Sequence, residues 1–398
     1  MDRYLRAGRL ATFAYFTLNG FLMGMWIVHI PVIEHRAGIS HALLGWLLLL
    51  LGAGAFAGMQ ATGPLTDRFG SRMVVPLSAA LCSAAVVLPG LAANAWALGA
   101  ALLVLGVGNG CLDVSMNAHA VQVEHGYQRP VMSAFHAAFS IGGVLAALVG
   151  ARTLSWNWSP VTTLGAVGLV GLAVTALAAP ALLRPAAARR PMDAAAAAPV
   201  VNAPRKTPRH IWALATLALM IMLCEGVAND WSALHLRNVL DAPAATAALA
   251  YGSFATTMTL GRLLADRVAA RFGPVAILRH GASVAALGLT AAALSPWIPL
   301  ALIGWAVFGA GLSGCVPQLF SAAGHTDQGA AATNVSRVAG LGYLGMLAGP
   351  AVIGPLTHVL PLNLTFFLPV SCCVIAAATA GIVRPSRHTP ALLEAEAV

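Results

Sequence analysis

The sequence predicts an all-α polytopic membrane protein in which twelve transmembrane helices form two pseudo-symmetric six-helix bundles. Three observations predict this class. The 398 residues are 59% hydrophobic and only 9% charged, whereas a soluble domain is typically about 25% charged. Twelve apolar stretches approach the length of about 20 residues that a helix needs to cross a bilayer. A short charged turn in the first half of the chain returns in the second half.

The apolar stretches fall into two groups of six. The expected spans are 10–33, 41–62, 73–92, 95–118, 131–151 and 161–183, then 210–230, 244–264, 275–295, 298–321, 334–356 and 363–383. The basic segment Met1–Arg9 and the apolar run after it superficially resemble a signal peptide. That run is too long for one and no small-residue cleavage site follows it, so it is interpreted as the first span.

The expected organisation is two helical halves joined by a basic, proline-punctuated connector. The predicted units are an N-terminal half (1–183), a cytoplasmic linker (184–209), a C-terminal half (210–383) and a cytoplasmic tail (384–398). Most Lys and Arg residues fall on one side of this arrangement, and Arg36, Arg152 and Arg237 fall on the other. Cytoplasmic loops carry the excess of Lys and Arg, so both termini and the linker are expected in the cytoplasm, with the protein in the cytoplasmic (inner) membrane.

Other functional classes find little support in the composition. The net charge of +9 could indicate nucleic-acid binding, but the basic residues lie scattered between apolar runs. The six cysteines lie inside apolar runs without metal-ligand spacing, which is typical of thiols that pack as small hydrophobes. No cofactor, metal or enzymatic activity is expected, and no G-x-x-x-x-G-K-[ST] motif for nucleotide-driven transport occurs.

The repeated turn is the most informative motif. It reads GPLTDRFGSR at 63–72 and places Asp67, Arg68 and Arg72 within six residues. A second echo joins Gly110-Cys111 in the fourth span to Gly314-Cys315 in the tenth. Repeats of this kind indicate two parallel copies of one six-helix unit. The copy of the turn contains Gly261, Asp266, Arg267 and Arg271.

This layout resembles the major facilitator superfamily of secondary transporters over nearly the whole chain. The turn matches that superfamily's loop 2–3 signature, G-x-x-x-D-R-x-G-x-R, at every defining position. Within the superfamily, 112–119, 129–136 and 229–233 are similar to the group of the rhizopine-associated membrane protein. The resemblance implies transport by alternating access, with spans 1, 4, 7 and 10 lining a central cavity.

The resemblance also implies a gate at the cytoplasmic side. A helix start favours negative charge by about 0.3–1 kcal/mol. Asp67 is therefore expected to contact the start of the eleventh helix, near Asn334, with Arg337 as a second candidate partner. Asp266 would make the pseudo-symmetric contact with the fifth helix. The alternative is a loop whose charges only fix topology. The predicted gate residues are Gly63, Asp67, Arg68, Gly70, Arg72, Asp266, Arg267 and Arg337.

Two acids inside spans are candidates for the transport site. Glu225 lies in the outer part of span 7 and Asp113 in the cytoplasmic part of span 4. A charge at the centre of a span costs about 2.5–3.5 kcal/mol by insertion scales, so such acids usually face a cavity. A desolvated carboxyl has a raised pKa, which makes Glu225 the leading proton or substrate site and Asp113 the second. The alternative for Asp113 is a structural acid bonded to Asn117.

Further polar side chains on cavity-lining spans predict the chemistry of the cargo. They are Asn19, Trp26, Asn109 and Gln318. Amides and an indole suit a polar, uncharged ligand such as a sugar, polyol or amino-polyol, although single amides equally form helix–helix bonds. His119 and His136 are interpreted as local helix bonds.

The leading hypothesis is a secondary transporter for a small polar solute, functional as a monomer and coupled to protons. One alternative is an exporter of a metabolite or drug-like compound. The standard proton-coupled drug exporters carry an arginine in span 4, and 102–106 has none. An alternative from another class is a membrane-embedded substrate sensor, which would usually need a larger output domain than the short tail provides.

Overall fold

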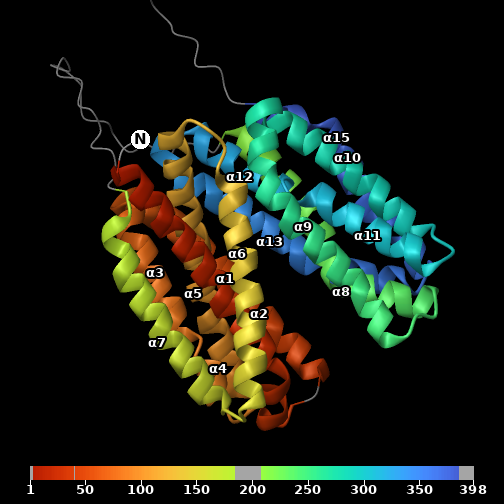
Figure 1. Ribbon diagram of the computed structural model, residues 1–398, viewed down its shortest axis with the longest axis horizontal. Coiled ribbons are helices and arrows are strands. Elements are labelled where there is room, and N and C mark those ends of the chain that lie inside the picture. Colours follow the sequence, from red (N-terminus) through yellow and green to blue (C-terminus); the bar gives the residue numbers. More distant parts are fainter. Residues whose placement is uncertain (1–2, 40, 184–207, 385–398) are drawn as a thin grey trace, which may run out of the picture.

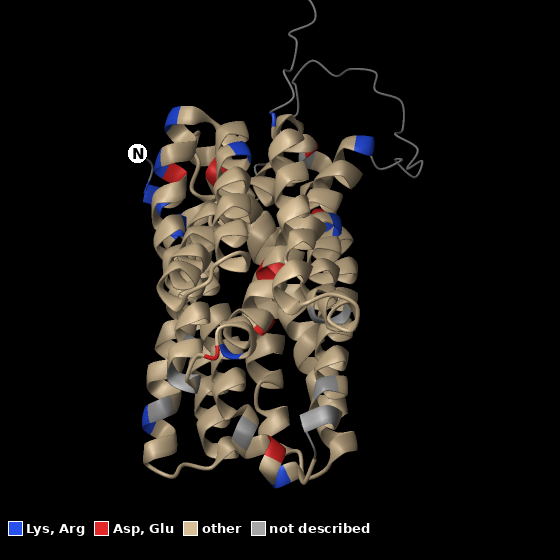
Figure 2. Ribbon diagram, turned by 90° about the vertical axis from the view of Figure 1, so that its right-hand side faces the viewer, with Lys and Arg blue, Asp and Glu red and all other residues tan. Residues whose placement is uncertain are grey.

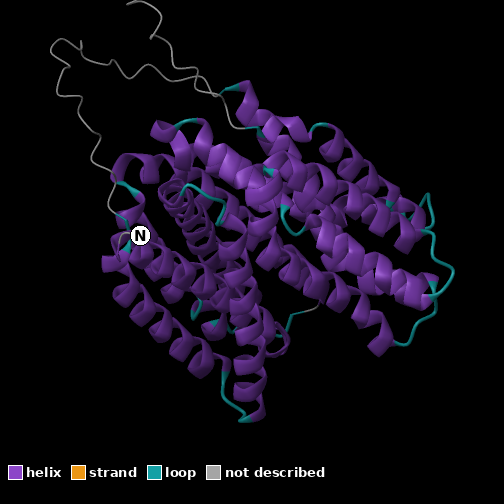
Figure 3. Cartoon of the chain, turned by 45° about the horizontal axis from the view of Figure 1, so that its top comes forward, coloured by secondary structure: helices purple, strands orange, loops and turns teal. Residues whose placement is uncertain are grey.

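The computed structural model describes residues 3–39, 41–183 and 208–384, which fold into helices and short loops with no strand among them (Figure 3). The predicted linker and tail therefore lie almost wholly outside the described residues. The N-terminal half contains α1 (Arg3–Ala37), α2 (His41–Phe69), α3 (Ser71–Ala85), α4 (Leu88–Leu91), α5 (Ala95–Tyr127), α6 (Met132–Ser155), α7 (Pro160–Ala178) and the short 3-10 helix η1 (Ala179–Ala181). The C-terminal half contains α8 (Arg209–Val239), α9 (Ala244–Phe272), α10 (Pro274–Ala293), α11 (Ile298–Leu312), α12 (Cys315–Thr326), η2 (Gln328–Ala330), α13 (Ala331–Leu356), α14 (Leu362–Thr365), α15 (Phe367–Ala378) and η3 (Ala380–Val383).

These helices build the predicted fold of twelve spans, and three of the spans are interrupted. The third span is α3 with α4, the tenth is α11 with α12, and the twelfth is α14 with α15. Ten stretches of the described chain are long and apolar enough to cross a membrane. The two remaining spans are α9, which carries several charges, and the shorter stretch Leu362–Ala378.

Several helices continue well beyond the predicted spans. The fourth span was expected to end at 118, but α5 runs to Tyr127. Likewise α8 runs to Val239 and α9 to Phe272. The reason is that an apolar run marks only the hydrocarbon-embedded part of a helix. As a consequence, Asp113 lies near the middle of α5 and not toward its C-terminal end, where the predicted span had placed it.

Equivalent helices pack in the same pairs in both halves (Figure 1). In the N-terminal half α1 packs on α6, α2 on α5, and α3 on α7; in the C-terminal half α8 packs on α13, α9 on α11, and α10 on α15. Figure 1 shows the first half in red to yellow and the second in green to blue. The internal symmetry suggested by the repeated turn therefore extends to the packing of the helices.

Small residues allow the closest of these approaches. A Cβ added to Gly20 of α1 would lie 2.0 Å from the carbonyl oxygen of Phe139 in α6. At the equivalent contact, a Cβ on Gly226 of α8 would lie 2.4 Å from the carbonyl oxygen of Met346 in α13. Membrane helices associate largely through such close backbone packing.

The halves meet through α2 with α13, α6 with α9, and α12 with both α5 and α6. Lys and Arg gather toward one end of the bundle, where the described chain stops at Leu183 and resumes at Pro208 (Figure 2). We call this the linker end. It includes the last turns of α2, α5 and α9 and the first turns of α6, α8 and α13.

Candidate functional site

The Asp67 carboxylate lies at the N-terminus of α13, in the opposite half of the molecule. Its Oδ1 accepts a hydrogen bond from the amide of Ala332 and its Oδ2 one from the amide of Thr333, both at 2.9 Å. The first amides of a helix have no partner inside the helix, and the positive end of the helix dipole favours a carboxylate there. Arg337 is not its partner, because Arg337 Nη1 donates instead to Asn334 Oδ1 at 3.4 Å.

Asp266 makes the equivalent contact from the C-terminal half. Its Oδ1 accepts from the amide of Ser133 at 2.9 Å and its Oδ2 from the amide of Ala134 at 2.7 Å, both at the start of α6. The two aspartates of the repeated turn therefore each bind a helix start in the other half. Both contacts lie at the linker end and hold that end together.

Glycines shape both copies of the turn. Gly70 and Gly273 each have a φ of 83°, a conformation that residues with a Cβ rarely adopt. Gly63 faces α13, where an added Cβ would lie 2.6 Å from Ser336 Oγ. The arginines of the turn have other surroundings: Arg68 stacks over Phe69 at 5.2 Å from its ring centroid. Within the described residues, Arg72 and Arg267 make no hydrogen bond or ion pair.

Glu225 forms an ion pair near the middle of α8, and so it does not lie in the outer part of its helix as predicted. Arg262 Nη2 of α9 lies 3.8 Å from Glu225 Oε1 of α8, and both side chains are largely buried. The same guanidinium donates from Nη1 to Ser140 Oγ of α6 at 3.1 Å. Arg262 thus connects an acid of its own half to a hydroxyl of the other half.

Asp113 has no such cation. Asn117 Nδ2 donates to Asp113 Oδ1 at 3.4 Å and to the Asp113 carbonyl oxygen at 2.9 Å. Asp113 Oδ2 is buried without a hydrogen-bond partner. In the described part of the chain, no Lys, Arg or His lies within ion-pairing distance of it. The bond to Asn117 fits the structural alternative considered for Asp113, but it leaves the charge of the carboxylate uncompensated.

The other predicted site residues are distributed around these acids and are not joined to them. Gln318 and Asn19 are buried, and Gln318 Nε2 and Asn19 Oδ1 have no hydrogen-bond partner. Trp26 belongs to the hydrophobic core. Among the described residues, no hydrogen bond connects Asn19, Trp26, Asn109 or Gln318 to Asp113 or Glu225.

The two histidines differ in their surroundings. His119 Nδ1 of α5 lies 2.8 Å from Ser71 Oγ at the start of α3, so its hydrogen bond joins two helices and is not the local helix bond that was expected. His136 stands between the rings of Phe16 in α1 and Phe320 in α12, at centroid distances of 5.5 and 5.8 Å. Its Nε2 is buried without a partner. His136 therefore belongs to an aromatic contact that crosses between the halves.

Sequence reasoning missed Arg262, Ser140 and Glu124. Arg262 lies inside the predicted span 244–264, and a cation within an apolar run was the available signal. Glu124 falls after the predicted end of span 4. In the structure Glu124 Oε2 accepts from the amides of Val131 and Met132, at 2.9 and 3.0 Å.

Known proteins share this architecture. Residues 10–350 match the Major Facilitator Superfamily. An uncharacterised MFS-type transporter of Yersinia pestis is 33% identical over 94% of this chain and 95% of its own length. The membrane protein MosC of Rhizobium meliloti is 28% identical over 91% of this chain and 86% of its own.

Solved structures agree in fold at low sequence identity. The transporter FucP in its outward conformation has a TM-score of 0.77 with 15% identity, covering 96% of this chain and 100% of that one. The proton:xylose symporter XylE has a TM-score of 0.69 with 12% identity, covering 94% of both chains. Sequence match and architecture together establish that this multi-pass membrane protein belongs to the major facilitator superfamily of transporters.

Proposed function

We propose that the protein is a proton-coupled secondary transporter that moves a small polar solute by alternating access. The cargo class is a sugar, polyol or amino-polyol. The linker end faces the cytoplasm, both termini are cytoplasmic, and the protein works as a monomer in the cytoplasmic membrane. The excess of Lys and Arg at the linker end supports this orientation.

The unpaired Asp113 carboxyl is the observation that carries the proposal. Burying an ionised carboxylate without a cation is costly, and such a group normally neutralises. Glu225 differs because Arg262 lies 3.8 Å away and balances its charge. The sequence ranks Glu225 ahead of Asp113 as the proton site. The ion pair leads us to propose the reverse: Asp113 carries the proton, and Glu225 holds Arg262 in position.

Neutral polar groups support an uncharged or weakly charged cargo. Asn19 Oδ1 offers an acceptor and Gln318 Nε2 a donor, both without partners in the protein. Hydroxyl groups can donate to the first and accept from the second. Two solved proteins of this fold are described as a fucose:proton symporter and a proton:xylose symporter, so the fold accommodates sugar transport coupled to protons.

Transport in proteoliposomes tests the proposal. Sugars, polyols and amino-polyols are screened with and without a pH gradient that is acidic outside. We expect one class to accumulate only with the gradient. Asp113→Asn should lose this accumulation while retaining exchange of labelled for unlabelled solute, because exchange needs no net proton movement.

Asp230→Asn is the matched control, since Asp230 lies exposed on α8. Gradient-driven accumulation that survives in Asp113→Asn would refute the assignment of the proton. If every polar solute fails and an organic cation is transported, the exporter alternative replaces the proposal.

A further inference from the structure

We propose that the hydrogen bond between Glu124 and Ser321 is a third contact that holds the two halves together at the linker end, in addition to the contacts of Asp67 and Asp266. We call the Glu124–Ser321 contact the latch. We further propose that His325 makes this latch respond to pH at the linker end. Glu124 is a positioning residue here, since it acts through helices and not on the cargo. The inference does not require a particular cargo or coupling ion, and its test is made without substrate.

Glu124 connects three helices through one carboxylate. Its Oε2 accepts from the amides of Val131 and Met132 at the start of α6, at 2.9 and 3.0 Å. Its Oε1 accepts a hydrogen bond from the hydroxyl of Ser321 in α12. Glu124 is 7% exposed. The bond to Ser321 crosses from the N-terminal to the C-terminal half, as the bonds of Asp67 and Asp266 do.

The start of α6 is consequently held by two acids, one from each half. Glu124 binds the amides of Val131 and Met132, and Asp266 binds those of Ser133 and Ala134. The first four amides of a helix normally lack partners, and here consecutive amides at this helix start all have one. Because Ser321 fixes Glu124 to α12, separating α6 from the C-terminal half requires loss of both the Asp266 and the Ser321 contacts.

Close packing of α5 on α12 brings the two latch residues together. A Cβ added to Gly324 of α12 would lie 2.5 Å from Val121 Cγ2 of α5. Gly324 is one helical turn after Ser321, and Val121 one turn before Glu124. A larger residue at 324 would move Ser321 away from the carboxylate.

His325 places a titratable group beside this contact. Its Nδ1 lies 2.8 Å from the Ser321 carbonyl oxygen and 4.0 Å from Glu124 Oε1. The first distance is a hydrogen bond when Nδ1 carries the proton, which leaves Nε2 as the atom that gains a second one. An imidazolium at this position attracts the Glu124 carboxylate and a neutral imidazole does not.

The sign of the pH effect follows from this geometry. A positive charge on His325 lies 4.0 Å from Glu124 Oε1, so we expect the latch to be stronger at low pH than at high pH. Histidine changes charge between about pH 5 and 8. Acidification on this side therefore stabilises the closed linker end.

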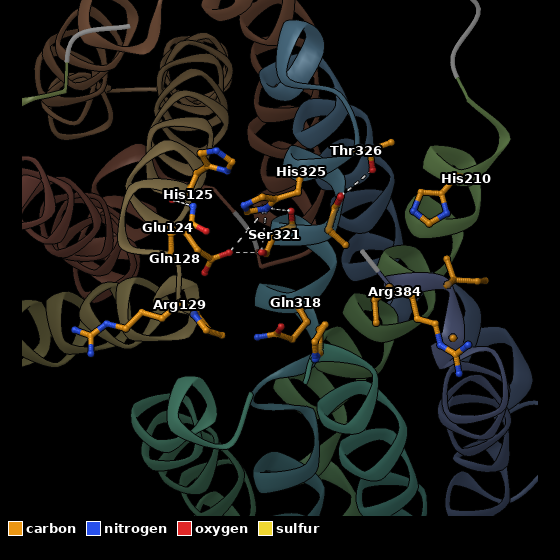
Figure 4. Close-up of a pocket in the computed structure, with 16 residues that line it drawn as sticks. Glu124, His125, Gln128, Arg129, His210, Gln318, Ser321, His325, Thr326 and Arg384 are labelled. Atoms are coloured by element: carbon orange, nitrogen blue, oxygen red, sulfur yellow. Dashed lines mark hydrogen bonds and ion pairs between the residues drawn. The ribbon is translucent and has the colours of Figure 1, made fainter. Parts of the chain in front are cut away.

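A pocket gives water access to these groups (Figure 4). It has a volume of about 710 Å³ and lies between the end of α5, α12 and the start of α8. Figure 4 shows the side chains of Glu124 and Ser321 pointing toward each other at the lining of the pocket and joined by a dashed line, with His325 on the next turn of α12. Its charged and titratable lining residues are Glu124, His125, Arg129, His210, His325 and Arg384. Asp266 approaches the same helix start from α9. His125 and His210 are the other groups that could produce a pH response, so both enter the test.

Hydrogen exchange of the α6 start tests the latch on the substrate-free full-length protein in lipid nanodiscs. The readout is the exchange of the Ser133 and Ala134 amides at about pH 6 and about pH 8, corrected for intrinsic chemical exchange. Asp266 protects these amides only while the halves are together. Ser321→Ala should raise the exchange rate of these two amides by about two- to tenfold, which is the factor that corresponds to one typical net hydrogen bond. Ser321→Thr keeps a hydroxyl donor and should exchange at the wild-type rate.

The pH response separates the roles of the histidines. Wild-type protection should fall from the lower to the higher pH, and His325→Gln should abolish the difference. His125→Gln, His210→Gln and the far-end control His358→Gln should keep it. Unchanged exchange in Ser321→Ala would overturn the latch. A pH response that survives in His325→Gln, or disappears in His125→Gln or His210→Gln, would overturn the role given to His325.

Discussion

Arg262 of α9 lies 3.8 Å from Glu225 of α8, and the same side chain reaches Ser140 in the other half. Arg262 precedes Asp266 by four residues, as Gly63 precedes Asp67 in the first copy of the turn. The two copies therefore use corresponding positions differently. Gly63 permits close contact with α13, whereas Arg262 forms an ion pair with Glu225 and a hydrogen bond with Ser140.

The Glu225–Arg262 pair gives the first prediction. Arg262→Gln leaves Glu225 buried without its cation, and breaking a buried pair costs about 3–5 kcal/mol. We expect a lower melting temperature and loss of transport. The double variant Glu225→Gln with Arg262→Gln removes both charges and should recover most of the stability but not the transport. A double variant that melts as low as Arg262→Gln would show that the pair is not energetically coupled.

The aspartates of the repeated turn should bias the conformational equilibrium. Asp67→Asn or Asp266→Asn removes the charge at a helix start, which is worth about 0.3–1 kcal/mol. We expect the ratio of closed to open linker ends to fall about two- to fivefold. Spin labels at the exposed positions Phe69 and Phe272, in a background without other reactive thiols, would report this as a larger population of long distances.

Asp241→Asn is the control for this charge change. Asp241 has a φ of 51°, a conformation that asparagine tolerates, and it lies in the loop between α8 and α9 at the far end. Equal distance distributions in the wild type and in both aspartate variants would leave the turn with only a topological role.

Gly63 should be sensitive to the addition of a single methyl group. In Gly63→Ala the new Cβ would lie 2.6 Å from Ser336 Oγ and 3.0 Å from Thr333 Cα. The backbone atom cannot be relieved by a side-chain rotation, so α2 and α13 must separate. We expect a shift toward the open linker end in the same distance measurement. Gly252→Ala meets no atom within 4 Å and should leave the distribution unchanged.

The stability of the protein should depend on the two positive-φ glycines, Gly70 and Gly273, of the repeated turn. Gly70 and Gly273 share a φ of 83°, with ψ values of 146° and 165°. A side chain held in such a region costs about 1–3 kcal/mol. Gly70→Ala and Gly273→Ala should therefore lower the melting temperature, whereas Gly381→Ala, at a site without positive φ or near neighbours, should not. An unchanged melting temperature in both turn variants would contradict this account.

Much of the fold could be read from local sequence. Apolar runs located the twelve spans, because every span must satisfy its own backbone in lipid. They did not locate the ends of α5, α8 and α9, which continue past the hydrocarbon region. They also did not reveal the breaks between α3 and α4 or between α11 and α12, which depend on local backbone geometry within an apolar run.

The sequence likewise identified some features of the candidate site and not others. The sequence singled out Asp113 and Glu225 because an acid inside an apolar run is rare. It could not show that Glu225 has a cation and Asp113 has none, since Arg262 is far from both in the chain. Glu124 escaped notice because it falls outside the apolar run that defined span 4.

By itself, the sequence determined the class of protein, its two-fold repeat and the position of the charged turn. These features follow from composition, from spacing and from a motif that is local in the chain. Only the tertiary structure decided which groups face each other: Asp67 with the start of α13, Asp266 and Glu124 with the start of α6, and Arg262 with Glu225. Helix packing brings these partners together from distant parts of the chain, and no local pattern encodes such a contact.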